Sequence, residues 1–143
     1  MCAPNSTIEF ALAHIGIHRY VRGVMVELVL AAKALADPTR VRVLAALREG
    51  ELCVCELSDA LEVTQSTLST HLQVIREADL VRTRKEGKWV YYALKPEAKR
   101  LLKGVFGFFA DGLETDSLLR RDAGRLQKRL AEREDGACCR GFA

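Results

Sequence analysis

The sequence contains no long hydrophobic run. Its most apolar segment, residues 24–36, is interrupted by Glu27 and Lys33 and falls short of the roughly 18 apolar residues that a membrane-spanning helix needs. The N-terminus also lacks a basic region followed by an apolar run and a small-residue cleavage site. We therefore expect a cytoplasmic protein without a membrane partner.

The sequence also has little net charge. The formal charge of the 143-residue chain is only +3, so a nucleic-acid partner cannot be inferred from composition, and any basic surface has to be local. Apolar residues make up 49% and charged residues 29%, the balance of a globular protein rather than a disordered chain. The chain has no internal repeat and no Gly-rich phosphate loop. Its length fits one domain with a modest core and an appended helix.

The five cysteines are an odd number and occur mostly in close pairs: Cys53 and Cys55, Cys138 and Cys139, and a separate Cys2. In a reducing cytosol this grouping indicates metal or redox chemistry rather than a disulfide framework. Free cysteine is otherwise a small buried hydrophobe, an interpretation that suits scattered cysteines better than paired ones. A thiol redox enzyme would need a thioredoxin-like context and a second base, which are absent. We therefore expect no enzyme and no organic cofactor.

Helical periodicity covers most of the chain, with clear start signals. Asp37 followed by Pro38 is typical of a helix N-cap with proline at the first helical position. Thr64 is a second N-cap candidate, and Gly50 marks a helix end. The helices predicted in this way are residues 8–15, 24–35, 38–49, 52–61, 65–78, 96–109 and 114–134.

The periodicity changes after Asp79. Residues 81–85 and 88–94 are rich in β-formers and flank Glu86-Gly87, which predicts a β-hairpin. Its aromatic residues, Trp89, Tyr91 and Tyr92, are expected to pack against the domain, because alternate strand positions face it.

The order of these elements predicts a mainly α fold with a small β-hairpin wing, a winged helix-turn-helix with flanking terminal helices. The helix-turn-helix is formed by the helices at 52–61 and 65–78. We expect residues 1–23 to form an N-terminal extension, 24–110 the winged-helix and dimerisation domain, and 111–143 a C-terminal helix and Cys-Cys tail.

The start of the second helix of this motif carries short hydrogen-bonding side chains. Amides and hydroxyls of this length let a helix enter the major groove and reach base edges or phosphates, and Gln65 can pair with adenine. Thr64 alone would satisfy a helix cap, so the further hydroxyls exceed what capping needs. We expect contacts with DNA from Gln65, Ser66, Thr67, Ser69, Thr70 and His71.

The hairpin supplies the local basic patch that the net charge conceals. A run of charges is often only a solvated face, but two strands with a cationic tip beside a helix-turn-helix can contact the DNA backbone or minor groove. The cations expected to do so are Arg82, Arg84, Lys85 and Lys88.

Four segments in this order resemble the ArsR/SmtB family of metal-sensing repressors: residues 34–40, 51–57, 66–72 and 85–92. The segment 51–57 resembles the metal box of the arsenic-responsive members. The likeness covers about residues 24–110. It implies a homodimer that binds an inverted-repeat operator in double-stranded DNA and dissociates when it binds its inducer. It also implies a dimer interface between the helix at 24–35 and the apolar stripe of the helix at 96–109, which we expect to use Leu101, Leu102, Val105, Phe106 and Phe109.

Cysteine thiolates select soft ions, so the expected inducer is arsenite, with antimonite, methylarsenite, cadmium, lead or zinc as alternatives. Residues two apart in a helix point about 200° apart. Cys53 and Cys55 therefore cannot hold one ion from within a regular helix. Either the helix begins after them or ligand binding unwinds its first turn.

Some arsenic-responsive members carry a third cysteine three residues after the second, where this chain has Ser58. Trivalent arsenic takes three sulfurs. Cys138 and Cys139 are the first candidates for the third ligand, followed by Cys2 and an exogenous thiol. For a trivalent organoarsenical two sulfurs suffice, which leaves that inducer open.

Overall fold

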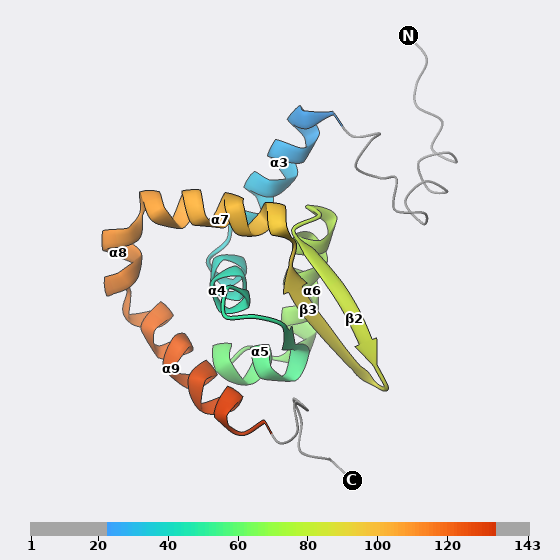
Figure 1. Cartoon of the computed structure of the whole chain (residues 1–143), viewed down its shortest axis with the longest axis vertical. Helices are drawn as coiled ribbons and strands as arrows, with labels where there is room; N and C mark the ends of the chain where they lie inside the picture. Colours follow the sequence, from blue (N-terminus) through green and yellow to red (C-terminus); the bar gives the residue numbers. More distant parts are fainter. Residues whose placement is uncertain (1–22, 134–143) are drawn as a thin grey trace.

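The computed structural model describes residues 23–133. It confirms a mainly α fold with a small antiparallel sheet (Figure 1). The helix predicted at residues 8–15 lies outside the described residues. The elements, in order, are α3 (Val24–Leu35), α4 (Pro38–Leu47), β1 (Leu52–Cys53), α5 (Val54–Leu61), α6 (Gln65–Glu77), β2 (Val81–Glu86), β3 (Trp89–Leu94), α7 (Pro96–Phe108), α8 (Ala110–Thr115) and α9 (Ser117–Ala131).

The predicted hairpin is present and forms the wing. Strands β2 and β3 pair antiparallel from Val81 opposite Leu94 to Glu86 opposite Trp89. The turn is therefore Gly87-Lys88, one residue later than predicted, because Glu86 is still paired in the strand. Gly87 has φ +58°, the left-handed conformation that a two-residue hairpin turn needs and that glycine adopts without steric cost.

The helix predicted to begin at Leu52 begins two residues later. Leu52 and Cys53 form a short strand, β1, which pairs with Tyr92 and Tyr91 of β3 and completes a sheet of order β1-β3-β2. Two residues are too few for their side-chain period to distinguish strand from helix. This pairing brings the cysteine segment against the wing.

The core is formed where α4, α5 and α6 meet, and α7 and α9 close it. The largest fully buried side chains include Leu44 and Leu47 of α4, Leu57 of α5, Leu72 of α6 and Leu126 of α9. Helix α9 runs along α5 on the side of the molecule away from the hairpin (Figure 1). This packing buries one face of α6 in the core and leaves the opposite face exposed.

The C-terminal helix predicted at residues 114–134 is two helices, α8 and α9. The break is at Asp116, whose Oδ1 accepts hydrogen bonds of 2.9 Å from the backbone N–H groups of Leu118 and Leu119. An aspartate in this position is an N-cap, so it starts a new helix and ends the preceding one. No helix among the described residues is long and apolar enough to cross a membrane.

The apolar stripe of α7 does not face outward as predicted. Leu102 and Phe106 are buried in the chain's own core, and Leu101 and Val105 pack partly against it. Only Phe109, at 57% exposure, remains open from the predicted set. The exposed apolar side chains lie instead on α3 and at the end of α7: Val24, Met25, Val26, Leu28, Val29, Phe108 and Phe109.

Candidate DNA-binding surface and cysteine site

The turn between α5 and α6 is tightly specified. Glu62 adopts a left-handed conformation with φ +53°, and Thr64 caps α6 by accepting a hydrogen bond from the Thr67 N–H. Ser58 donates its hydroxyl to the carbonyl oxygen of Val63 at 2.6 Å. Ser58, three residues after Cys55, therefore holds this turn in place.

The first two turns of α6 expose the polar residues predicted to contact DNA. Gln65, Ser66, Thr67, Ser69 and Thr70 are all exposed, whereas the opposite face is buried in the core. Ser69 donates to the carbonyl oxygen of Gln65 at 2.8 Å, so its hydroxyl lies against the helix backbone and does not widen the exposed face of α6. The structure brings these five side chains together on one surface.

His71 lies apart from this surface. Its Nδ1 is buried, makes no hydrogen bond within the described residues and lies 3.5 Å from Oδ1 of Asp37, the N-cap of α4. A hydrogen bond from the Arg40 N–H lowers the pKa of Asp37, and the nearby His71 lowers it further. His71 thus belongs to the contact between α4 and α6, and its side chain does not project with the exposed hydroxyls.

The wing presents its four cations to solvent, but one of them is engaged within the chain. Arg84 donates to Glu51 at 2.6 and 3.0 Å and to Glu86 at 2.6 Å. Its guanidinium also lies 4.4 Å from the ring centre of Tyr91. The hydrogen bonds to Glu51 and then Glu86 raise the pKa of Arg84.

The other three wing cations carry no ion pair with another described residue. Arg82 and Lys85 are exposed on β2, and Lys88 sits in the turn with its Nζ 4.9 Å from the Trp89 ring centre. Tyr91 and Tyr92 are buried, as predicted for wing packing. The cations available at the wing surface are therefore Arg82, Lys85 and Lys88.

Cys53 and Cys55 meet at the start of α5, where the structure joins them in a disulfide with a Cα–Cα distance of 5.4 Å. Cys53 has an extended backbone and is the N-cap, whereas Cys55 is in the first turn. The helix begins between the two cysteines, at Val54. Neither a helix start after both cysteines nor unwinding of the first turn is needed, because the extended backbone of Cys53 already brings the two sulfurs together.

The cysteine pair lies against the wing. Cys53 is 1% exposed and packs with Tyr91 of β3, while Cys55 and Trp89 pack against this small cluster. Cys53 and Tyr91 are also paired residues of strands β1 and β3. The cysteines therefore lie at the start of α5 and in contact with strand β3 of the wing.

A buried glutamate completes the start of α5. The Cys53 N–H donates to Oε2 of Glu56 at 2.9 Å, and the Glu56 N–H donates to Cys53 Sγ at 3.4 Å. Glu56 is fully buried, and Arg133 donates to both its carboxylate oxygens at 2.6 and 2.8 Å. The Cys-x-x-Glu spacing, like the Ser-x-x-Glu of a capping box, was a signal for Glu56. No local pattern indicated Arg133.

Three arginines at four-residue spacing attach α9 and the residues after it to α5. Arg125 donates to the carbonyl oxygen of Ala60 at 2.7 Å, Arg129 donates to Asp59 at 3.0 Å, and Arg133 binds Glu56. Residues four apart lie on one face of a helix, so these side chains follow the length of α5. The described chain therefore ends beside the cysteine site.

Within residues 23–133, no group of three His, Cys, Asp or Glu side chains is arranged to hold a metal ion. The other predicted ligands, Cys138 and Cys139, and the less favoured Cys2 lie outside the described residues.

Known proteins resemble this chain in sequence and in fold. The sequence model of a family described as "bacterial regulatory protein, arsR family" matches residues 37–83. The arsenic resistance transcriptional regulator ArsR1 of Pseudomonas putida is 48% identical over 91 residues, which cover 60% of this chain and 71% of that protein. The chain belongs to the arsR family of bacterial regulatory proteins.

Two further comparisons agree with this assignment. The arsenical resistance operon repressor of Escherichia coli is 51% identical over 65 residues, or 45% of this chain and 56% of that protein. A solved homodimeric winged helix-turn-helix DNA-binding domain of a possible ArsR-family regulator from Mycobacterium bovis superposes with a TM-score of 0.59 at 28% identity, covering 66% of this chain and 88% of that chain. The family segment, residues 37–83, includes the cysteine pair and α6 but not α9.

Proposed function

We propose that this chain is a transcriptional repressor that binds operator DNA through α6 and the wing and leaves it when Cys53 and Cys55 bind arsenite. The observation that carries the proposal is the position of the two cysteines between the DNA-facing elements. They lie at the start of α5, which leads into α6, and they pack on Tyr91 of the wing strand. The arsenic-resistance names of the Pseudomonas putida and Escherichia coli relatives support arsenite as the inducer.

The reduced pair is the binding form. Each thiol condenses with one hydroxyl of arsenous acid, which forms one As–S bond and releases one water with no change in oxidation state. Backbone N–H groups in the first turn of α5 favour the thiolate, and the Glu56 N–H already points at Cys53 Sγ. Thiolates are the ligands that soft ions prefer, so antimonite and cadmium are the next candidates.

Release follows from the contacts of Cys53. An ion bonded to both sulfurs imposes its own bond lengths and angle on the pair, which displaces Cys53 from its capping position and shifts Tyr91 of the wing. Movement of α5 also acts on α6 through the turn that Ser58 holds by its bond to Val63. The two DNA-contacting elements thereby lose the relative placement that operator binding requires.

The third sulfur for arsenite comes, in this proposal, from Cys138 or Cys139. Arg133 is anchored beside the site through Glu56 and through the carbonyl oxygen of Glu51 at 2.9 Å. Cys138 follows Arg133 by five residues, a length that spans at most about 17 Å when extended. A methylated trivalent arsenical needs only two sulfurs, and the described residues supply two.

The repressor is proposed to act as a homodimer on an inverted repeat. The apolar residues of α3 and the end of α7 are exposed, and exposed hydrophobic surface on a small protein often marks an interaction site. The homodimeric state of the Mycobacterium bovis domain supports this assembly. Two-fold symmetry then places two α6 helices on the two half-sites.

The decisive experiment is a DNA-release titration with reduced protein and DNA from upstream of its own gene. Arsenite, antimonite, methylarsenite, cadmium and zinc are added in turn to the wild type and to C53S, C55S and the double variant. Serine is a preferred N-cap, so Cys53→Ser keeps the start of α5, and all variants should bind DNA like the wild type. We expect the variants to stay on DNA after arsenite addition, with Cys2→Ser responding like the wild type. Release of the double variant by arsenite would refute the proposed sensor.

A further inference from the structure

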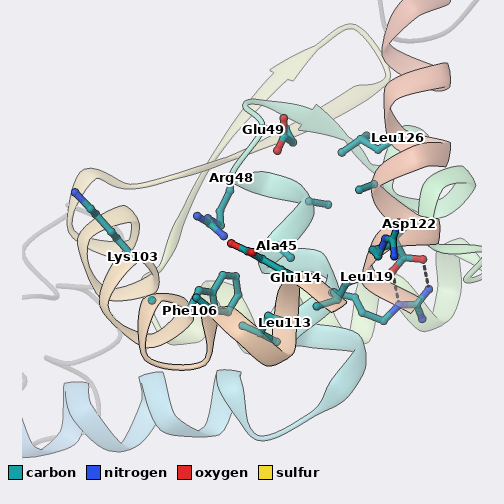
Figure 2. Close-up of a pocket in the computed structure, with 16 residues that line it drawn as sticks. Ala45, Arg48, Glu49, Lys103, Phe106, Leu113, Glu114, Leu119, Asp122 and Leu126 are labelled. Atoms are coloured by element: carbon teal, nitrogen blue, oxygen red, sulfur yellow. Dashed lines mark hydrogen bonds and ion pairs between the residues drawn. The ribbon is translucent and has the colours of Figure 1, made fainter. Parts of the chain in front are cut away.

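A cavity of about 490 Å³ opens between α4, α7, α8 and α9 (Figure 2). Arg48 and Phe106 lie on one side, and Asp122 and Leu126 of α9 lie on the other. It contains none of the residues expected to bind DNA or the metalloid. Its apolar wall is formed by Ala45, Ala46, Phe106, Leu113, Leu119 and Leu126.

The size and lining of this cavity suit a small organic molecule. Ligand sites in proteins have volumes of roughly 300–1,000 Å³ and are mostly apolar, with a few polar groups that fix the ligand's orientation. A second copy of the chain is a poorer fit, because the exposed apolar residues that a dimer would cover lie elsewhere. None of Met25, Leu28, Phe108 and Phe109 lines the cavity.

The polar groups at its edge favour an anion. Arg48, Lys103 and Arg120 are exposed and form no ion pair with another described residue, and the Arg48 guanidinium lies 5.1 Å from the ring centre of Phe106. Three acidic residues also line the cavity. Asp122 is neutralised by Arg42 at 2.6 Å, so the remaining charges are two carboxylates, Glu49 and Glu114, and the three cations. Guanidinium groups bind carboxylates and related oxyanions in a bidentate manner.

We propose that this cavity binds an amphipathic organic anion, with a flat apolar body against Phe106 and the leucines and one acidic group at Arg48, Lys103 and Arg120. Such a molecule also contacts Arg42, which lines the cavity and donates to the carbonyl oxygen of Leu61 at 2.6 Å. Leu61 is the last residue of α5, before the turn into α6. The occupant therefore touches a side chain that ties the cavity to the helix-turn-helix.

The probe is 1-anilinonaphthalene-8-sulfonate, whose fused rings and single sulfonate match this class. N-phenyl-1-naphthylamine has the same rings without the charge and serves as the matched neutral probe. Both are titrated fluorimetrically into the full-length reduced protein without DNA. We expect saturable binding of the sulfonate at one site per chain, and weaker binding of the neutral probe.

Two pairs of variants locate the binding. A Cβ added at Gly107, which lines the cavity, or at Gly124, which does not, meets no atom within 4 Å, so both accept a larger side chain. Gly107→Trp should weaken both probes by at least about tenfold because the indole occupies the cavity, whereas Gly124→Trp should not. Arg48→Gln with Arg120→Gln should weaken the sulfonate alone, by about tenfold, as expected for lost charge-assisted hydrogen bonds.

The matched charge control is Arg121→Gln with Lys128→Gln, two exposed cations of α9 that do not line the cavity. Equal sulfonate binding by this control, the arginine double variant and the wild type would overturn the proposal. So would unchanged binding of both probes to Gly107→Trp. Loss of probe binding as the protein is concentrated would assign the cavity to a contact between copies, and would overturn it as well.

Discussion

Arg133 and Glu56 are 77 residues apart in sequence and form a two-pronged ion pair, with Nε–Oε1 at 2.6 Å and Nη2–Oε2 at 2.8 Å. Glu56 is fully buried, and the same Oε2 accepts a hydrogen bond from the Cys53 N–H. Arg133, at the end of the described chain, is thus attached to Glu56 in the first turn of α5, beside the two cysteines. A buried carboxylate needs such a partner, because an unpaired charge in the interior is costly.

Replacing Arg133 should therefore destabilise the whole domain. We expect Arg133→Gln to lower the free energy of unfolding by about 3 kcal/mol, the lower end of the cost of leaving a buried charge without its partner, because Arg133 itself is partly exposed. Urea unfolding of the reduced protein, followed by circular dichroism, measures this. The control is Lys128→Gln, an exposed cation on α9, which should change little. Equal stability of the two variants would show that Arg133 does not support Glu56.

The tail cysteines should matter for arsenite and not for a methylated arsenical. The double variant Cys138→Ser, Cys139→Ser should need at least about tenfold more arsenite for DNA release, the loss that removal of even an outer-shell partner causes at metal sites. Methylarsenite, with two exchangeable positions, should act as on the wild type. Both are measured as release midpoints on the same DNA. Unchanged arsenite sensitivity would remove the tail from the site.

The wing and α6 should contribute differently to DNA binding. Lys88→Ala should weaken binding to all sequences and flatten the salt dependence by about one unit, as for one lost phosphate contact. Gln65→Ala should instead reduce discrimination between operator and random DNA. Arg84→Ala should flatten the salt dependence less than Lys88→Ala, because Arg84 is already paired with Glu51 and Glu86. Anisotropy titrations at several salt concentrations separate the three outcomes.

Asp37 should stabilise the domain only while it is ionised. Its carboxylate caps α4 through the Arg40 N–H at 3.0 Å, and that bond lowers its pKa. A lowered pKa in the folded state means that the stabilisation is present above the ordinary carboxyl value and is lost as the pH falls through the lowered value.

We therefore expect Asp37→Ala to cost about 1 kcal/mol at pH 7, with the difference from the wild type shrinking at an acid pH below the ordinary aspartate pKa of about 3.9. Asp37→Ser is the matched control, because serine caps a helix without titrating in this range. Urea unfolding at both pH values measures the effect. A cost for Asp37→Ala that stays constant with pH would contradict it.

Dimer formation should depend on the exposed face of α3. Leu28 is 62% exposed in the single chain, and Leu28→Glu would place a charge in the proposed interface. We expect the dimer dissociation constant to rise by at least about tenfold, measured by light scattering over a dilution series. Gly124→Glu, which places the same charge at an exposed position of α9 outside the proposed interface, is the control. A wild type that is monomeric at micromolar concentration would refute the proposed assembly.

The sequence alone determined the helix-turn-helix, the hairpin and the residues at which α4 and α6 begin, because these depend on local patterns. Asp37 followed by Pro38, the cap at Thr64 and the strands around Gly87 act within a few residues of their own elements. The exposed hydroxyls of α6 were predicted for the same reason, since one buried face of a helix leaves the other open.

Only the tertiary structure decided what depends on contacts between distant segments. Strand β1 exists because Leu52 and Cys53 find partners in β3, and Arg133 meets Glu56 only once α9 packs along α5. Periodicity marked Leu102 and Phe106 of α7 as apolar but could not say which partner would bury them. The chain's own core buries these two side chains, and the exposed apolar surface lies mostly on α3. Hydrophobic patterning identifies the face that will be buried, whereas the packing of the whole chain selects what covers it.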